Sequence, residues 1–360
     1  MSKDGVKRWA MRLLVCTGLL MGCSAETNTG PGAADARGGG ADSEVEEGES
    51  ADTQPLGEDA RTAPDSGLRS DTGGAPDQPG LVYEGSFELR NSDDAATLAA
   101  YSEVSGDLTI SAPELTELDL PLLTRVGGTL SFHWNRKLSV FELPALERTG
   151  DLDIYENWET LTAVSLPALT TCAEVSISKN TFLETLALPA LTKVSSIHIS
   201  NHDQLISVAL SGLTSVEGAL GVNRSAKLEG FELPALTSAA SVHLFENDML
   251  SSFAIPGLTA VSQWIIVADM PVLTDFDLNS LETIGDRLSV YTNAALLTLG
   301  LNALTSVGGL LAIKDNASLA QCLVDAWIAQ VGVGDESVIT GNNPHCSCTE
   351  VDGSLTASCL

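Results

Sequence analysis

The residues with the richest chemistry in this sequence are its seven cysteines, four of which fall within the last 39 positions. These four are Cys322, Cys346, Cys348 and Cys359. An even group of cysteines in an exported chain predicts two disulfides, and among the three connectivities we favour Cys322–Cys346 with Cys348–Cys359. The alternative is a zinc site, although Cys346-x-Cys348 beside His345 lacks the usual spacing of zinc ligands.

Two further cysteines have different expected roles. Cys172 occupies an apolar position and is expected to be a buried free thiol. A basic start and a short apolar run lead to Leu20-Met21-Gly22-Cys23, which resembles the bacterial lipobox. The resemblance implies a signal peptide over residues 1–22 and a diacylated Cys23 that attaches the protein to a membrane. With Ser24 next in the chain, it also implies a bacterial outer-membrane or cell-surface location.

Residues 23–80 are expected to form a disordered acidic tether behind the lipidated cysteine. Positions 24–80 contain 13 acidic and 3 basic side chains, eleven glycines and only three large aliphatic residues. Such a segment cannot bury enough apolar area to offset its chain entropy.

The net charge excludes one class of partner. The chain has 48 acidic and 18 basic side chains, a formal net charge of −30, while 44% of its residues are hydrophobic. Phosphate backbones would be repelled by this charge, so we predict no nucleic-acid binding. The hydrophobic content is enough for a folded core.

Beyond residue 101 the chain repeats every 22–23 residues. Units begin at Thr124, Glu147, Thr170, Thr192, Thr214, Thr237, Thr259, Glu282 and Thr305. Within a unit the apolar residues alternate with a period of two, which predicts short strands. Like positions stacked about 4.8 Å apart would give parallel sheets and continuous apolar ladders. We therefore predict an all-β fold, a parallel β-solenoid of about ten turns over residues 81–322.

One ladder is polar and is predicted to be structural. An asparagine follows the second inward apolar residue by three positions in most turns: Asn135, Asn157, Asn180, Asn247, Asn293 and Asn316. His202, Ser225 and Met270 replace it in the other turns. Asparagine at a bend satisfies local backbone groups and, when stacked, those of the next turn.

These repeats are similar to the receptor L-domain family, a leucine-rich solenoid also found in bacterial surface lipoproteins. The resemblance rests on strings such as Val104-Ser-Gly-Asp-Leu-Thr-Ile110 and Val307-Gly-Gly-Leu-Leu-Ala-Ile313, and covers about 87–322. The resemblance implies that the solenoid is right-handed, and it carries no catalytic residues. A short helix beginning near Ser92 is expected to cap the first turn, and residues 323–360 are expected to form a disulfide-bonded C-terminal cap whose helix covers Leu323–Val331.

Exposed aromatic side chains supply the candidate ligand surface. One outward strand position holds His133, Tyr155, Phe245 and Tyr291, with Trp134 beside the first. These rings could stack on sugars or contact a protein partner, and the alternative is that they pack on neighbouring bends. His198 and His243 share another outward column two turns apart, too far to hold one metal ion.

Together these features favour a non-catalytic, lipid-anchored cell-envelope protein that binds an unknown protein or polysaccharide. We expect no enzyme activity, no cofactor and no metal, because the sequence has no nucleophile motif, phosphate-binding loop or Ca²⁺ loop, and its short spacing leaves no room for a catalytic insertion. One alternative is a structural envelope protein whose solenoid ends associate. Another is a polysaccharide-active β-helix enzyme.

Overall fold

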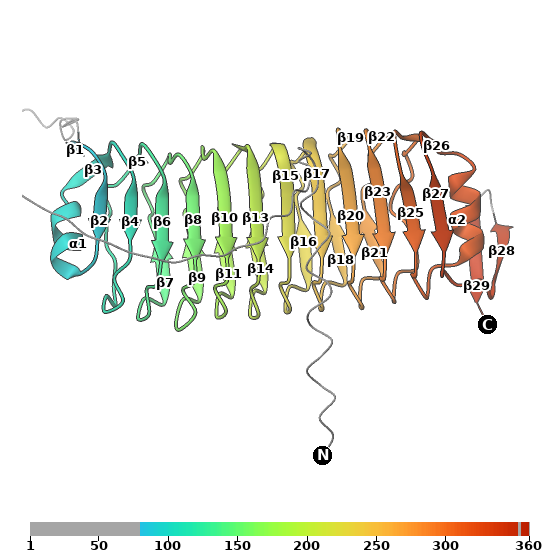
Figure 1. Ribbon diagram of the computed structural model, residues 1–360, viewed down its shortest axis with the longest axis horizontal. Coiled ribbons are helices and arrows are strands. Elements are labelled where there is room, and N and C mark those ends of the chain that lie inside the picture. The colour runs from blue at the N-terminus through green and yellow to red at the C-terminus, as the bar shows by residue number, and fades with distance from the viewer. Residues whose placement is uncertain (1–79, 352–353, 360) are drawn as a thin grey trace, which may run out of the picture. The chain divides into compact units, whose positions relative to one another are not determined.

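The computed structural model describes residues 80–351 and 354–359, which lie in one compact unit. The expected signal peptide over 1–22, the Cys23 lipid site and the tether over 23–80 fall outside these residues, apart from Gly80. The prediction of a parallel β-solenoid is confirmed, with about 11 turns, roughly one more than expected. The coils lie side by side in a row between two helices (Figure 1).

The longest sheet takes one strand from each coil, and neighbouring strands are parallel and in register. Its strands are β2 (Phe87–Leu89), β4 (Leu108–Ile110), β6 (Leu130–His133), β8 (Leu152–Tyr155), β10 (Glu174–Ser178), β13 (Ser196–Ser200), β15 (Ser215–Asn223), β17 (Ser238–Phe245), β20 (Trp264–Ala268), β23 (Arg287–Tyr291), β25 (Leu311–Lys314) and β27 (Ser337–Thr340). We call this surface the main sheet. Short strands precede it in several coils: β1 (Leu81–Tyr83), β3 (Tyr101–Val104), β5 (Arg125–Val126), β12 (Lys193–Val194), β19 (Ala260–Val261), β22 (Thr283–Ile284), β24 (Ser306–Val307) and β26 (Gly332–Val333).

A second face of the coils is built from two smaller parallel sheets. The first contains β7 (Val140–Glu142), β9 (Ala163–Ser165), β11 (Thr185–Ala187) and β14 (Ser207–Ala209). The second contains β16 (Gly230–Glu232), β18 (Ser252–Ala254) and β21 (Asp275–Asp277). β14 and β16 lie in neighbouring coils but belong to separate sheets, whereas the main sheet runs without interruption past the same point. In the coil of β14 the usual Pro-Ala-Leu bend is replaced by Ser-Gly-Leu. A Cβ on Gly212 in this bend would lie 2.5 Å from the Pro189 carbonyl oxygen of the preceding coil.

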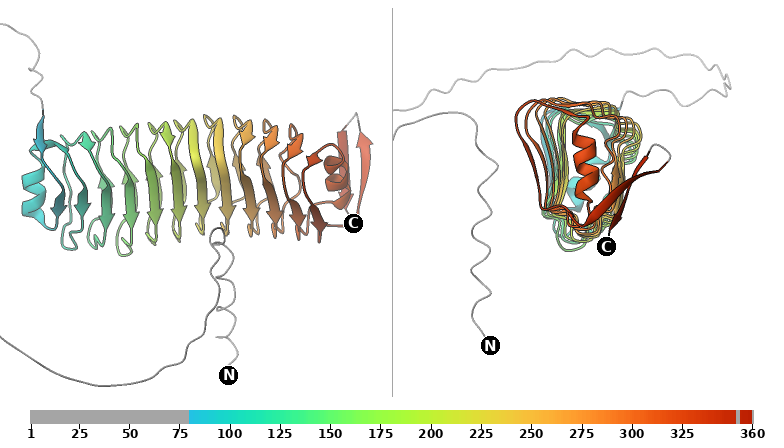
Figure 2. Two further views of the ribbon diagram at one scale, coloured as in Figure 1. Left: turned by 45° about the horizontal axis from the view of Figure 1, so that its top comes forward. Right: turned by 90° about the vertical axis from the view of Figure 1, so that its right-hand side faces the viewer.

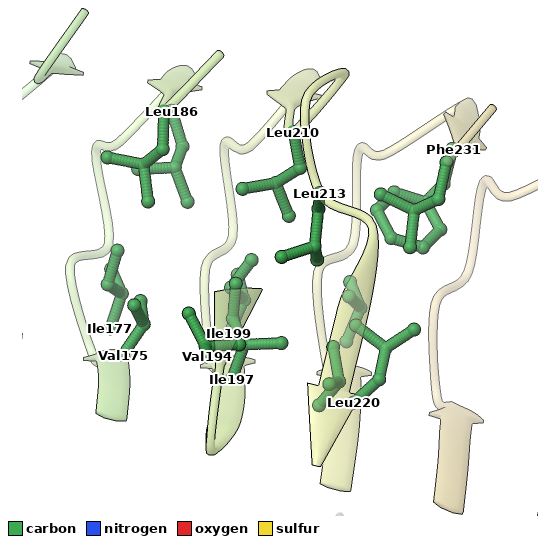
Figure 3. Packing of buried hydrophobic residues seen from close by; sticks show 14 of the residues in the cluster. Val175, Ile177, Leu186, Val194, Ile197, Ile199, Leu210, Leu213, Leu220 and Phe231 are labelled. Atoms are coloured by element: carbon green, nitrogen blue, oxygen red, sulfur yellow. The ribbon is translucent and has the colours of Figure 1, made fainter. Parts of the chain in front are cut away.

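The core fills the space between the main sheet and the second face. Every second residue along each strand points inward, and these inward residues are apolar. Stacked coils therefore align leucine, isoleucine and valine in columns. Figure 3 shows Ile177, Ile197 and Ile199 from the main-sheet side facing Leu186 and Leu210 from the other. The predicted leucine ladder from Leu123 to Leu304 is buried throughout.

Helices cover both ends of the stack (Figure 2). α1 (Ser92–Leu98) follows Asn91, whose side-chain oxygen accepts hydrogen bonds from the N–H groups of Asp93 and Asp94, so the cap is Asn91, one residue before the predicted position. α2 (Gln321–Ile328) begins two residues earlier than expected. Its Trp327 indole donates a hydrogen bond to the Leu301 carbonyl across the open end.

The solenoid does not stop at residue 322 as the repeat pattern had indicated. β26 and β27 follow α2 and pair with β24 and β25, so the helix replaces one side of a last complete coil. A hairpin of β28 (Cys346–Val351) and β29 (Ser354–Cys359) then packs beside α2. The signal for the extra coil is Ile339-Thr-Gly-Asn342, which has the repeat's spacing from inward residue to asparagine.

Candidate ligand-binding surface

The outward positions of the main sheet carry the aromatic residues singled out in the sequence. His133 ends β6 and Tyr155 ends β8, and the two are direct partners across neighbouring coils. Phe245 lies four coils beyond Tyr155, roughly 19 Å away along the stack. Tyr291 lies two coils farther on. The structure therefore brings together His133, Trp134 and Tyr155, which we call the aromatic platform, and leaves Phe245 and Tyr291 apart from it.

The aromatic platform is a set of three rings in which His133 contacts both of the others. The ring centroids of His133 and Tyr155 are 4.8 Å apart with an angle of 31° between the planes. Those of His133 and Trp134 are also 4.8 Å apart, in an edge-to-face arrangement. Trp134 keeps 48% of its surface exposed, while His133 and Tyr155 are half-buried. The rings thus support one another and still present a large aromatic area to solvent.

Charges around the platform are largely compensated. The Trp134 indole donates a hydrogen bond of 3.0 Å to Glu156, and Lys179 forms an ion pair of 3.0 Å with the same carboxylate. Trp134 and then Lys179 hold the pKa of Glu156 below its ordinary value. Burial lowers the pKa of His133, against a smaller opposing effect of Glu156, so the imidazole is neutral at pH 7. Its Nδ1 is buried without a hydrogen-bond partner.

Small polar side chains flank the platform on the same face. Ser131 and Ser176 are the cross-coil partners of Asp153, and Ser178 is the partner of Tyr155. Burial raises the pKa of Asp153, and the nearby carboxylates of Asp151 and Glu174 raise it further. The surroundings of the rings are therefore hydroxyls and one carboxyl group rather than other apolar side chains.

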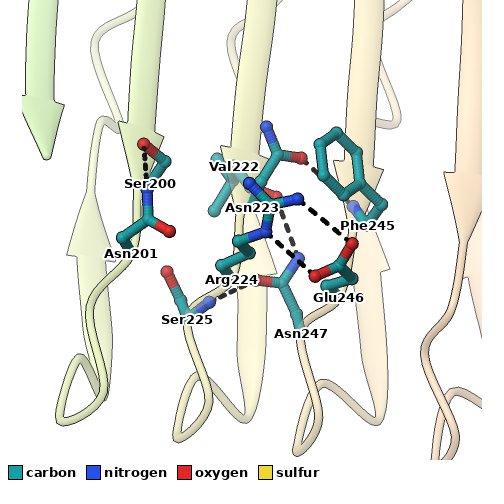
Figure 4. A network of polar contacts seen from close by, with 9 residues as sticks. All are labelled: Ser200, Asn201, Val222, Asn223, Arg224, Ser225, Phe245, Glu246 and Asn247. Atoms are coloured by element: carbon teal, nitrogen blue, oxygen red, sulfur yellow. Dashed lines mark hydrogen bonds and ion pairs between the residues drawn. The ribbon is translucent and has the colours of Figure 1, made fainter. Parts of the chain in front are cut away.

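Phe245 and Tyr291 each lie beside a cation from a neighbouring coil. The Arg224 guanidinium lies 5.5 Å from the centre of the Phe245 ring, and Lys314 lies 5.3 Å from that of Tyr291. Arg224 also forms two hydrogen bonds with Glu246 in the next coil (Figure 4). Arg224 belongs to the bend of the preceding coil, whereas Lys314 is the strand partner of Tyr291 in the next coil.

A column of left-handed residues, not anticipated from the sequence, positions Trp134. Nine successive turns, from β6 to β25, each have one non-glycine residue with φ between 53° and 63°, and Gly341 with φ 73° takes this place in the last coil. Each lies directly before the asparagine-ladder position: Trp134, Glu156, Lys179, Asn201, Arg224, Glu246, Asp269, Thr292 and Asp315. Left-handed backbone normally favours glycine, asparagine or aspartate, so the residue types gave little signal. Because the conformation recurs, side chains of successive coils stack at this bend, as in Trp134–Glu156–Lys179 and Arg224–Glu246.

The asparagine ladder fixes these bends from inside. All six predicted asparagines are buried. The Asn157 side-chain oxygen accepts from the backbone N–H of Asn135, and its amide nitrogen donates to the Phe132 carbonyl and to the side-chain oxygen of Asn180. Asn293 and Asn316 repeat this arrangement. The ladder also has a member that the sequence reasoning missed, Asn342, which accepts from the Asn316 N–H.

The ladder is interrupted in two consecutive coils, at His202 and Ser225. Both are fully buried. His202 places Nδ1 3.2 Å from the Asn180 carbonyl oxygen and Nε2 3.1 Å from that of Ile177, but a neutral imidazole has one N–H and can donate to only one of them. The Ser225 hydroxyl has no partner. Both interruptions fall in the coils where the second face divides between β14 and β16.

Replacing His202 with asparagine is expected to raise the free energy of unfolding by about 1 kcal/mol at pH 7, because the amide restores a donor for Ile177 and an acceptor for the Asn180 N–H. Burial lowers the pKa of His202 from its ordinary value of 6.5. The unfolded chain therefore binds a proton that the folded chain does not, and the wild-type protein loses stability as the pH falls below about 6.5. Urea denaturation at pH 7 and pH 5 measures both effects.

The matched control for this variant is His345→Asn, which changes an exposed histidine in the last coil. It should leave both the stability and its pH dependence unchanged. An H202N protein that loses as much stability on acidification as the wild type would contradict the role given to this imidazole.

The second pair of histidines does not form a metal site. His198 and His243 face outward on either side of Gly221, and the Trp264 indole donates a hydrogen bond to His243 Nε2. Burial, and then His198, lower the pKa of His243. Among residues 80–351 and 354–359, no group of three or more histidine, cysteine or acidic side chains could hold a metal ion.

Two shallow grooves cross the outer surface of the described part of the chain. One, of about 410 Å³, lies over β16, β18 and β21 and includes Glu232, Asp275 and Asp277. The other, of about 400 Å³, lies over the short strands near Ser215 and Thr283 and includes Glu217. Neither lining contains a histidine, lysine or arginine to work with these carboxylates as a base or as an electrophile.

The cysteines pair differently from the expectation. The disulfide joins Cys322 to Cys348, with Cα atoms 5.9 Å apart, so the favoured Cys322–Cys346 and Cys348–Cys359 pairings are wrong. Cys346 is also disulfide-bonded, and it lies opposite Cys359 in the hairpin. Cys172 is buried and free, and burial raises its pKa to about 12, so it is an inert thiol at neutral pH.

Comparison with known proteins does not assign this chain to a family. Within the part of the chain that the structure describes, neither helix has the length and apolar character needed to span a membrane. No family model matches the sequence, and neither a curated protein nor a solved structure matches the chain.

Proposed function

We propose that this protein is a non-catalytic, lipid-anchored component of a bacterial cell envelope that uses its solenoid surface to bind a protein or a polysaccharide. The lipobox-like Leu20-Met21-Gly22-Cys23 and the acidic segment behind it support an anchored protein held away from a membrane. The repeat strings support a relationship to the receptor L-domain family. The outer membrane or cell surface is the proposed location.

The observation that carries the binding role is the aromatic platform. A half-exposed tryptophan in contact with a second ring is costly to leave in water, whereas Phe245 and Tyr291 in the same column each lie beside a cation. His133 and Tyr155 end strands of the main sheet, and the bend that carries Trp134 is fixed by the hydrogen bond from the Asn135 N–H to Asn157, so the platform is held on a rigid scaffold.

The two alternatives have less support. End-to-end assembly would need open coil ends, whereas α1 and α2 cover the two ends described (Figure 2). A lyase-type polysaccharide enzyme would need acids combined with a basic residue in a groove, whereas the acid-lined groove over β16, β18 and β21 has no basic residue in its lining.

The anchoring part of the proposal can be tested by detergent partitioning of the full chain expressed in a bacterium. Cys23→Ser is expected to move the protein from the membrane fraction to the soluble fraction, because the thioether to the lipid can no longer form. Cys16→Ser, in the apolar run of the same segment, is the matched control and should leave the protein in the membrane fraction. Retention of the Cys23→Ser protein in the membrane fraction would contradict the lipid anchor.

A further inference from the structure

We infer that the aromatic platform of His133, Trp134 and Tyr155 binds a neutral polysaccharide, with sugar rings stacked on Trp134 and Tyr155. This inference rests on the proposed binding function and names its ligand class. The C–H faces of a pyranose ring are apolar and flat, and they match an exposed aromatic face, whereas the hydroxyl groups around the ring edge need polar partners. The platform offers both kinds of contact within three neighbouring coils.

The aromatic part of the contact is already in place. Trp134 is 48% exposed, and its indole N–H is occupied by Glu156, so the orientation of the ring is fixed before any ligand arrives. His133 contacts both Trp134 and Tyr155 and holds them as one surface. A ligand that stacks on these rings therefore does not have to order them first, which lowers the entropic cost of binding.

The polar side chains beside the rings are better suited to the hydroxyl groups of a sugar than to an apolar surface of a protein partner. Ser131, Ser176 and Ser178 supply hydroxyls beside the rings, and Asp153 supplies a carboxyl group. A protein hot spot is usually an aromatic residue within a ring of contacts that exclude water. Here the neighbours on the sheet are polar and partly exposed, which suits a ligand that brings many hydroxyl groups of its own.

The charges favour a neutral polymer over an acidic one. Glu156 is already paired with Lys179, and Arg136 is 3.6 Å from Glu159, so the cations nearest the rings are engaged. Asp151 and Glu174 raise the pKa of Asp153, which shows that the adjoining face is negative. A polymer that carries carboxylate or sulfate groups would add repulsion there and on the chain as a whole, whose net charge is −30.

The test is affinity electrophoresis of the full chain in gels that contain single soluble polysaccharides. The neutral probes are laminarin, dextran, galactomannan and arabinoxylan, and the acidic probes are alginate and polygalacturonate. We expect at least one neutral probe to retard the protein and both acidic probes to leave its mobility unchanged. Intrinsic tryptophan fluorescence with the retarding probe gives the dissociation constant.

The repeat itself supplies variants that the fold accepts. Tyr155→Ser places at this position the residue found in the next two coils, Ser178 and Ser200, and Trp134→Asn places there the left-handed residue of another coil, Asn201. Each is expected to weaken binding at least tenfold with an unchanged circular dichroism spectrum. Tyr291→Ser is the matched control, since it removes an aromatic ring from the same column six coils beyond Tyr155, and should bind as the wild type does.

The outcomes separate the ligand class from the binding function. Retardation by no neutral probe, or by the acidic probes alone, would overturn the inference. If a purified envelope protein then bound the full chain and Trp134→Asn abolished that binding, the platform would keep its proposed function with a different ligand. Release of reducing ends from any probe would instead contradict the non-catalytic role. Equal loss of binding in Tyr291→Ser would show that the platform is not the site.

Discussion

Replacing Asn157 with alanine is expected to lower the free energy of unfolding by about 4 kcal/mol, the effect of several buried hydrogen bonds lost together. Its side chain accepts from the backbone and side-chain N–H groups of Asn135 and donates to the carbonyls of Phe132 and Tyr155 and to Asn180. Alanine removes all of these and leaves the Asn135 N–H and the Phe132 carbonyl buried without partners. Chemical denaturation monitored by circular dichroism measures the loss.

Asn302→Ala is the matched control for this prediction. Asn302 lies on an exposed bend, and the hydrogen bond recorded for it uses its backbone N–H, so the variant should remain within about 0.5 kcal/mol of the wild type. A loss below about 1 kcal/mol in Asn157→Ala would show that water or a backbone shift replaces the ladder bonds. The ladder would then have to be regarded as a consequence of the coil geometry rather than a source of its stability.

Removing the Cys322–Cys348 disulfide by a double substitution to alanine is expected to lower the stability of the C-terminal cap by about 3 kcal/mol, because the bond closes a loop with a sequence separation of 26. It ties the first turn of α2 to β28. Thermal unfolding of the oxidised protein should show a lower midpoint for the variant. Non-reducing peptide mapping should recover Cys322 and Cys348 in one cross-linked fragment.

Cys172→Val controls for the loss of a thiol as such. Valine occupies the same ladder position in the following coils at Val194 and Val216, so this variant should fold with unchanged stability. A cross-linked fragment containing Cys322 and Cys346 would contradict the pairing. A double variant as stable as the wild type would show that the helix end is held without the bond.

Much of this fold could be predicted from the sequence because the spacing of apolar residues within each repeat determines the geometry of a coil. A period of two within a unit of 22–23 residues leaves room only for short strands, and identical units stack. The ladder positions of Leu123, Asn157 and Val194 follow from that spacing alone, and all three are buried. Side-chain chemistry and register agree at these positions, so local and long-range preferences point to one structure.

What could not be predicted depends on angles and distances that the repeat does not encode. The left-handed backbone at Trp134 and Thr292 is imposed by the coil rather than by residue type. The disulfide partner of Cys322 was uncertain because Cys346 and Cys348 are two positions apart, and the hairpin register, which places Cys346 opposite Cys359, decides it. The aromatic platform could be identified only from the contacts of its rings, because His133 and Tyr155 lie against each other whereas Phe245 lies against Arg224.

The division of the second face between β14 and β16 gives the solenoid an uneven mechanical character. On the main sheet, β13, β15 and β17 are joined strand to strand, while on the opposite side the two small sheets meet without forming one ladder. Bending the stack toward the main sheet separates neighbouring coils on the second face. Between the coils of β14 and β16 this motion therefore opens fewer hydrogen bonds than it does between coils that are joined on both faces. The solenoid is in this sense two stiff segments that are joined by strand pairing on the main sheet alone, and the aromatic platform lies wholly on the first segment.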